Sequence, residues 1–305
     1  MTGALETSRT SNEAAGDERP LLHLAHSPDP DDAFMWWPLF ELNGTAPKVD
    51  TGRFRFEPVT EDIEVLNQRS AAADLAITAM SCAQYPHVAD RYAITSCGAS
   101  MGDAYGPKLV AREVMPVEAL RERDLLVAVP GTRTSAFGAL SLILGAGSFR
   151  HEVVPFDRII DAVADGSVDA GLVIHEGQLT FEAAGLHKLV DVGTWWTQTT
   201  GLPMPLGVNC IRRDLEEAHG PGTLKEVTAT LLRSVEYALE HREASIAYAL
   251  DYARDMGAEL ADEFVAMYVN RWTLDFGDQG RTAVAEFLGR LAAIGLVPQV
   301  TPEFV

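Results

Sequence analysis

The sequence predicts an α/β protein of two lobes with a ligand cleft between them. Apolar runs of strand length alternate with amphipathic helical stretches, which is typical of βαβ units built on a parallel sheet. This plan occurs twice, at residues 21–81 and again at 125–175. An extended, proline-rich segment at 202–213 follows, and the rest of the chain has helical periodicity. We therefore expect the chain to build part of one lobe, cross to the second, and return to close the first.

The first lobe begins with the apolar run at 21–27, which predicts a strand. The next segment, 28–41, opens with proline and aspartates before its apolar positions, and such residues are signals that start a helix. The same alternation predicts a strand at 54–60, a helix at 62–73 and a strand at 74–81. The glycine-rich stretch at 98–107 is then expected to lead out of this lobe.

The second lobe repeats the plan, and the C-terminal part is helical. Strands are expected at 125–130, 151–156 and 169–175, with helices at 134–147 and 157–166. C-terminal helices are expected near 224–242, 243–256, 262–272 and 281–294. These elements divide the chain into a disordered tail at 1–20, lobe I at 21–107 plus 210–305, and lobe II at 108–209.

Length and composition limit the class of protein. At 305 residues and 47% hydrophobic content, the chain can bury a large core and suits two domains better than one. The first twenty residues lack the apolar core of a secretory signal, and no later stretch offers the roughly 18 consecutive apolar residues of a membrane span. Cys82, Cys97 and Cys210 are far apart, so neither a disulfide framework nor a thiolate metal site is expected. We expect a cytoplasmic protein.

The net charge narrows the range of partners. A formal charge of −20 argues against nucleic acid and against an anionic membrane surface, because both need clustered Lys and Arg. A small anionic ligand would be repelled by the overall field, so backbone N–H groups or a helix N-terminus would have to hold it. The oligomeric state is left open, a homodimer included.

Two segments that follow strands of lobe I carry polar side chains where a ligand is expected. Ligand sites in such folds lie beyond the carboxyl ends of the strands, at the interface of the lobes. The turn "HSPDPDDAF" holds Ser27, Asp29, Asp31 and Asp32, and the segment after the third strand holds Thr78, Ser81 and Cys82. Both groups could cap a helix or contact a ligand. The spacing of the aspartates does not match a calcium loop.

The segment "VPGTRTSAFGAL" in lobe II combines a Pro-Gly turn with hydroxyl residues at a predicted helix start. Thr132, Thr134 and Ser135 would lie beside free N–H groups, which is a favourable place for an anion such as a carboxylate. An ordinary capped helix would have the same composition. The phosphate-binding P-loop and the G-x-G-x-x-G dinucleotide motif are both absent, so no nucleotide cofactor is indicated.

The segment "LVIHEGQLTF" places His175 and Glu176 at the carboxyl end of a buried strand. It is not a zinc-protease motif, because Leu179 stands where H-E-x-x-H requires histidine. His175 could be a hydrogen-bonded structural residue or a general base, since imidazole titrates near neutrality. Glu176 could tune it, although adjacent residues on a strand point to opposite faces.

In this order and spacing the motifs "SPDPDDAF", "MSCAQYP", "YGPKLV", "VPGTRTSAFGAL" and "IHEGQLTF" resemble the 1,4-dihydroxy-6-naphthoate synthases of the futalosine pathway to menaquinone. The resemblance implies a periplasmic-binding-protein-like fold of type II. It also implies conversion of cyclic de-hypoxanthine futalosine to dihydroxynaphthoate, with no metal and no organic cofactor. By position, His175 would be the proton-abstracting base. The substrate site would consist of Asp32, Ala79, Met80, Ser81, Thr134 and Ser135.

The chain departs from the family pattern at a few positions. The family would read cysteine, asparagine and threonine where this chain has Asp29, Asp31 and Ala33, and it often has lysine at the position of Ala79. These changes remove a cation and add carboxylates near an anionic substrate. Two alternatives stay open: a chorismate dehydratase-like enzyme of the same pathway, and a non-catalytic protein that binds a small carboxylate.

Overall fold

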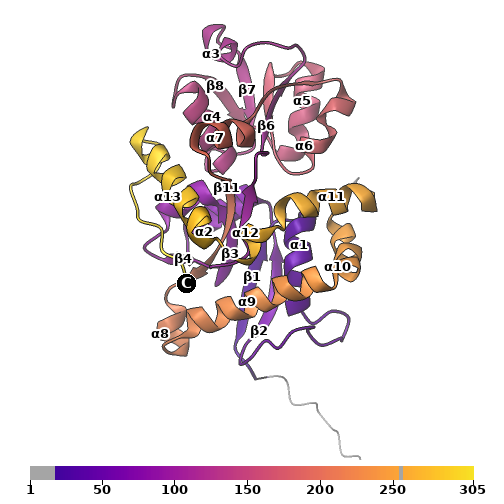
Figure 1. Ribbon diagram of the computed structural model, residues 1–305, viewed down its shortest axis with the longest axis vertical. Coiled ribbons are helices and arrows are strands. Elements are labelled where there is room, and N and C mark those ends of the chain that lie inside the picture. Colours follow the sequence, from indigo (N-terminus) through magenta and orange to yellow (C-terminus); the bar gives the residue numbers. More distant parts are fainter. Residues whose placement is uncertain (1–17, 254–256) are drawn as a thin grey trace, which may run out of the picture.

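The computed structural model describes residues 18–253 and 257–305. The expected disordered tail at 1–20 lies outside this part of the chain, except for 18–20. The same holds for residues 254–256 at the end of the helix expected at 243–256. The two described ranges form an α/β structure of two lobes, each with its own sheet (Figure 1). The predicted fold class is confirmed.

Lobe I is built on a mixed sheet. Its strands are β1 (Leu21–His26), β2 (Arg55–Thr60), β3 (Ile77–Ser81), β4 (Tyr92–Ile94), β5 (Ser100–Gly102) and β11 (Met204–Arg212). Five strands lie in the order β2-β1-β3-β11-β4. The sixth, β5, pairs with the end of β11 that β4 does not contact. The strands β1, β2 and β3 run parallel, and the returning strand β11 is antiparallel to β3. The carboxyl ends of β1 and β3 therefore meet at one edge of the sheet.

Helices from both ends of the chain surround this sheet. They are α1 (Pro30–Trp36), α2 (Ile63–Ser70), α8 (Leu215–His219), α9 (Thr223–Glu240), α10 (Arg242–Ala249), α11 (Ala258–Tyr268), α12 (Arg271–Leu274) and α13 (Gly277–Ala293). Helix α9 packs against α1, so the C-terminal part of the chain completes the core that the N-terminal part begins. In Figure 1, α11 and α13 lie near the level where the two lobes meet.

Lobe II is built on a second sheet with the order β10-β6-β9-β7-β8. Its strands are β6 (Lys108–Ala111), β7 (Leu126–Val129), β8 (Arg150–Val153), β9 (Ala170–Val173) and β10 (His187–Asp191). Its helices are α3 (Ala119–Glu122), α4 (Ser135–Leu144), α5 (Ile159–Asp165), α6 (Gly177–Thr180) and α7 (Val192–Thr200). Short 3₁₀ segments occur in both lobes at Trp37–Leu39, Cys82–His87, Phe156–Arg158, Phe181–Ala184 and Leu250–Tyr252.

The structure contains elements that were not expected from the sequence, among them β4, β5, β6, β10 and α7. The stretch 187–200, for which no element was predicted, forms β10 and α7. Asp191 caps α7 by accepting a hydrogen bond from the N–H of Thr194. The expected boundary between 209 and 210 falls inside β11, which pairs along its length with strands of lobe I.

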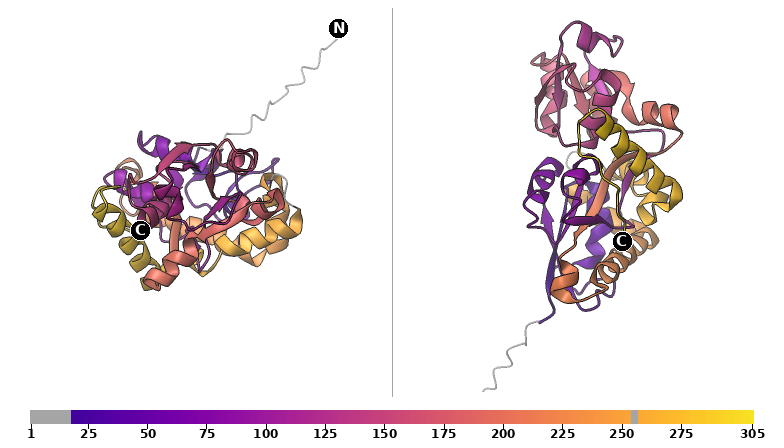
Figure 2. Two further views of the ribbon diagram at one scale, coloured as in Figure 1. Left: turned by 90° about the horizontal axis from the view of Figure 1, so that it is seen from above. Right: turned by 90° about the vertical axis from the view of Figure 1, so that its left-hand side faces the viewer.

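An apolar core continues from one lobe into the other on the side of α13. One cluster of buried residues joins Met80 of β3, Leu140 of α4 and Phe287 of α13. Gly138 makes a close approach possible here, since a Cβ at this position would lie 3.0 Å from Leu291 of α13. The right-hand view of Figure 2 shows α13, in yellow, beside the level where the lobes meet. The lobes are thus held together by apolar packing on this side.

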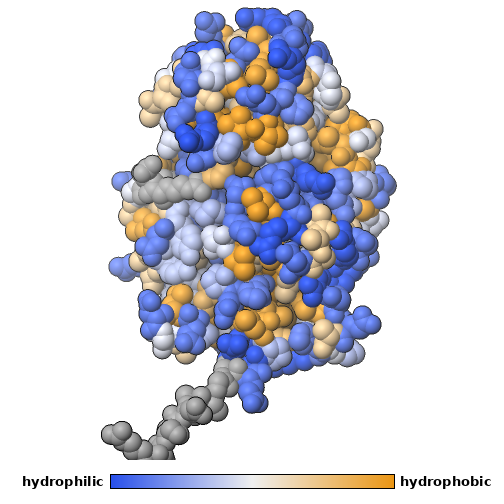
Figure 3. Space-filling view, turned by 180° about the vertical axis from the view of Figure 1, so that it is seen from behind, coloured by the Kyte–Doolittle hydropathy of each residue, from blue (hydrophilic) through white to orange (hydrophobic). Residues whose placement is uncertain are grey.

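The surface seen from behind is mainly hydrophilic, and its apolar residues form small, separate patches (Figure 3). The exposed large hydrophobic side chains of the described residues are Val65, Val114, Val153 and Ile294. No helix within 18–253 or 257–305 is both long and apolar enough to span a membrane.

Candidate functional site

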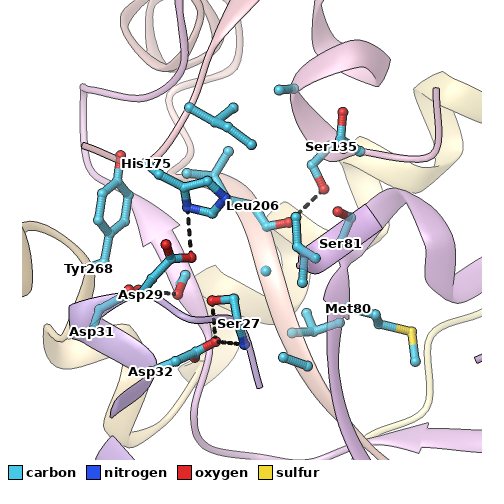
Figure 4. Close-up of a pocket in the computed structure, with 18 of the residues that line it drawn as sticks. Ser27, Asp29, Asp31, Asp32, Met80, Ser81, Ser135, His175, Leu206 and Tyr268 are labelled. Atoms are coloured by element: carbon cyan, nitrogen blue, oxygen red, sulfur yellow. Dashed lines mark hydrogen bonds and ion pairs between the residues drawn. The ribbon is translucent and has the colours of Figure 1, made fainter. Parts of the chain in front are cut away.

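A pocket lies between the two lobes, at the carboxyl ends of their strands. Its lining includes all the substrate-site and catalytic residues expected from the sequence, namely Asp32, Ala79, Met80, Ser81, Thr134, Ser135 and His175. Residues of α11 and β11 complete the walls, among them Tyr268, Leu206 and Asn209. Figure 4 shows the aspartates of lobe I on one side of this pocket and Ser135 on the other.

His175 stands just after β9 and faces Asp29 of lobe I. The Nδ1 atom of its ring lies 2.9 Å from Oδ2 of Asp29, whose side chain is only 3% exposed. The ring of Phe156 packs edge-on against the imidazole, with 4.7 Å between ring centroids. The second ring nitrogen, Nε2, points away from Asp29 toward the side of the pocket that holds Leu206 (Figure 4). This arrangement leaves Nε2 facing the space that a ligand would fill.

The backbone of His175 has a left-handed conformation, with φ of 52°. A non-glycine residue in this region carries strain of about 1–3 kcal/mol, and such strain gathers at functional sites. Gln178 holds the turn, because its N–H and its side-chain Nε2 both donate to the carbonyl oxygen of His175 at 3.2 Å. The local structure therefore positions the imidazole at the end of the strand.

The surroundings of His175 favour its protonated form. Burial by itself lowers the pKa of the imidazole, but the charge and hydrogen bond of Asp29, with further contributions from Glu176 and Asp31, raise it to about 9. The acidic neighbours thus outweigh burial. The carboxylate that contacts the ring is Asp29, and Glu176, which follows His175 in the sequence, contributes by charge.

The turn between β1 and α1 buries three carboxyl groups at the pocket. Oδ2 of Asp32 accepts hydrogen bonds from N–H and Oγ of Ser27, at 2.9 and 2.7 Å. Asp31 accepts a hydrogen bond from Oγ of Ser100 at 3.3 Å. Asp29 occupies the N-cap position of α1 but makes no side-chain capping bond. Helix capping by its side chain therefore does not explain why an aspartate stands at position 29.

Burial and crowding oppose ionisation in this turn. The pKa of Asp31 is raised well above its ordinary value of 3.8, first by burial and then by the carboxylates of Asp32 and Asp29. The pKa of Asp32 is also raised by burial, although the charge of His26 and the bonds from Ser27 oppose this. For Asp31 and Asp32, burial therefore favours the protonated carboxyl group.

Replacing Asp31 with asparagine is expected to stabilise the protein increasingly as pH rises. Because its folded-state pKa is raised, Asp31 contributes stability that is fully present below pH 3.8 and is lost as pH rises toward the folded-state value. The asparagine side chain does not ionise, so the gain in free energy of unfolding over the wild-type protein should grow above about pH 4. Urea unfolding of both proteins at pH 5 and pH 8 measures this gain, and an equal gain at the two values would contradict the explanation.

Hydroxyl groups at the start of α4 and at the end of β3 also line the pocket, and each is already hydrogen-bonded within the protein. Thr134 caps α4, since its Oγ1 accepts from the N–H of Phe137 and donates to the carbonyl oxygen of Gly131. Ser135 Oγ donates to the carbonyl oxygen of Leu206 at 2.6 Å, across the lobe interface. The Ser81 hydroxyl accepts from Asn67 Nδ2 at 3.0 Å. These side chains thus shape the pocket as well as line it.

Several residues of the site could not be found from the motifs. Tyr268 of α11 donates to Oε1 of Gln178 at 2.8 Å, although the two residues belong to helices far apart in the sequence. The contact between Asp29 and His175 likewise joins distant segments. The tryptophan pairs Trp36-Trp37 and Trp195-Trp196 do not line the pocket, and Trp36 and Trp196 are fully buried in the core.

The described residues include no group of three or more His, Cys, Asp or Glu side chains arranged to hold a metal ion. The buried aspartates of the β1–α1 turn do not form such a set. Among the described residues that line the pocket there is no lysine and no arginine. The groups that these residues offer to an anionic ligand are backbone N–H groups, hydroxyls, side-chain amides and the histidine.

Comparison with known proteins gives a consistent result. A protein-family model described as menaquinone biosynthesis matches residues 22–293. A curated relative from Thermus thermophilus, a 1,4-dihydroxy-6-naphthoate synthase, is 41% identical over 289 residues, covering 93% of this chain and 99% of the relative.

Solved structures agree on the fold. A crystal structure of a protein from Archaeoglobus fulgidus has a TM-score of 0.82 and 39% identity, and the match covers 91% of this chain and 98% of that one. The alkanesulfonate-binding protein SsuA from Xanthomonas axonopodis has a TM-score of 0.67 at 13% identity, covering 92% and 94%. The match to SsuA concerns the fold alone, and it shows that this chain has a periplasmic-binding-protein-like structure.

Proposed function

The chain belongs to the menaquinone-biosynthesis family, and from this premise we propose that it is a 1,4-dihydroxy-6-naphthoate synthase. Its substrate is then cyclic de-hypoxanthine futalosine, a small anion, and its product is 1,4-dihydroxy-6-naphthoate. The reaction is that of a lyase, which needs no metal and no organic cofactor. A cytoplasmic location is part of the proposal, in keeping with three buried free cysteines.

The observation that carries the proposal is the position of His175 at the interlobe pocket. Its Nε2 faces the ligand space, while Nδ1 is engaged by Asp29. A histidine held in this way can accept a proton through Nε2 when the ring is neutral. We assign it the removal of a proton from the sugar-derived ring of the substrate. Elimination with carbon–carbon cleavage follows, and aromatisation of the second ring drives it.

The start of α4 is the proposed binding place for the substrate carboxylate. Thr134 already satisfies the N–H of Phe137. The amides of Ser135 and Ala136 lie in the first helical turn, where N–H groups have no partner within the helix. Such amides, together with the helix dipole, attract an anion. This explains how an anion could bind in a pocket whose described lining residues include no lysine or arginine.

The opposite wall receives the remainder of the substrate. We propose that Ala79 and Met80 of β3 provide buried apolar contact, since they are 6% and 0% exposed. Ser81 ends β3, Asp32 lies in the first turn of α1, and both supply polar contact. Burial raises the pKa of Asp32 and so favours its protonated form, which can donate a hydrogen bond to a substrate oxygen and repels an anionic ligand less.

The direct test is turnover. The purified protein is incubated with cyclic de-hypoxanthine futalosine, and the naphthoate is followed by its absorbance and identified by mass spectrometry. Product formation at a rate proportional to enzyme concentration supports the assignment. A parallel incubation with chorismate tests for a dehydratase, and calorimetry detects binding without turnover. Product from chorismate alone, or binding alone, would contradict the synthase proposal.

A further inference from the structure

We propose that Asp29 is the positioning residue of His175 and that the pair is complete only while the two lobes are together. The proposal rests on the role of His175 as the base of the reaction described above. It adds a residue that family resemblance does not assign, since the family pattern has cysteine at this position. The geometry of the pair carries the argument.

The two members of the pair come from different lobes. Asp29 lies in the turn between β1 and α1 of lobe I, and His175 follows β9 of lobe II. The carboxylate is 3% exposed and the histidine 17%, so little water competes for their contact. Moving the lobes apart on this side would separate Oδ2 from Nδ1. Closure of the pocket and completion of the base are therefore one event.

A second contact across the lobes holds the backbone of His175. Gln178 donates to the carbonyl oxygen of His175, and its own Oε1 accepts the hydrogen bond from the hydroxyl of Tyr268, which belongs to lobe I. Tyr268 and Asp29 lie on the same side of the pocket as His175 (Figure 4). Both the ring and the main chain of His175 are thus held by lobe I.

The chemical consequence concerns the proton on the imidazole ring. A carboxylate accepts only, so it selects the tautomer with the proton on Nδ1 and leaves the lone pair on Nε2. In the described part of the chain, the other titratable groups near the ring are Asp31, Glu176 and Tyr268, which lies on the same side of the pocket. Because the pKa of His175 is raised to about 9, kcat/KM of the wild-type enzyme should rise with pH up to that region.

The decisive variant is Asp29→Asn, which keeps the size of the side chain but removes its charge. An amide can offer either its oxygen or its NH₂ group to Nδ1, so it no longer selects the tautomer. We expect kcat to fall about 10²–10⁴-fold at the wild-type optimum, with little change in KM. The acidic limb of the kcat/KM profile should move to lower pH, so the loss should be smaller at pH 6 than at pH 9.

The matched control is Asp32→Asn, which makes the same change at a nearby side chain that bonds to Ser27 and not to His175. The acidic limb should stay in place in this variant. A titration of the His175 ring by NMR in the free protein gives a second readout that requires no substrate. The pKa of His175 should fall in Asp29→Asn and remain unchanged in Asp32→Asn.

The two readouts separate the possible failures. An unmoved titration of His175 in Asp29→Asn would overturn the pairing. A shifted titration with an unmoved acidic limb would show a structural contact only, and would overturn the positioning role. If the wild-type protein forms no naphthoate, the proposed function fails, and the NMR titration still decides whether Asp29 governs the protonation of His175.

Discussion

His175→Ala is expected to lower kcat for naphthoate formation by about 10²–10⁴-fold, the range that a positioned general base supplies. The substitution removes the only imidazole that lines the pocket in the described part of the chain. Substrate affinity should change little, because the proposed carboxylate site at α4 is intact. Steady-state kinetics with saturating substrate measures kcat, and calorimetry with the variant measures binding.

Glu176→Ala provides the control for this prediction. Glu176 is the sequence neighbour of His175, and it acts on the ring through charge while Asp29 makes the contact. Its loss should therefore reduce kcat far less than the loss of His175. Circular dichroism of both variants checks that each is folded. Equal turnover by His175→Ala and the wild-type enzyme would exclude His175 as the base.

Trp36→Ala is expected to have the largest effect on stability, about 3–5 kcal/mol of unfolding free energy, as for other buried aromatic truncations. Trp36 is 0% exposed and belongs to the core of lobe I. Its ring lies directly against Gly98, since a Cβ there would come within 2.8 Å of two ring carbons. Because Gly98 lines the pocket, the cavity left by the ring would also loosen one wall of the site.

Trp195→Ala is the matched control, because it makes the same chemical change at a side chain that is only partly buried. It should cost less than Trp36→Ala. Trp36→Phe should retain most of the packing and cost less than the alanine variant, since the indole Nε1 of Trp36 has no hydrogen-bond partner among the described residues. Urea unfolding measures all three variants. Equal losses at Trp36 and Trp195 would contradict the assignment of Trp36 to the core.

Local patterns were sufficient to predict much of the architecture. The expected strand at 21–27 and the structure's β1 (Leu21–His26) coincide because an apolar run bounded by polar and proline residues needs no distant information. The helix expected at 134–147 is α4 (Ser135–Leu144), capped by Thr134. In contrast, β10 was not predicted, because "HKLVD" is short, half-exposed and carries only two apolar residues.

By itself the sequence determines the alternation of strands and helices, the two-lobed plan, and which polar residues stand at strand ends. These properties follow from patterns a few residues long. The tertiary structure alone decides that Asp29, rather than the adjacent Glu176, contacts His175, and that Tyr268 reaches Gln178. Such contacts join segments from different lobes, and their distances depend on how the apolar packing around α13 sets one lobe against the other. No local pattern encodes that placement.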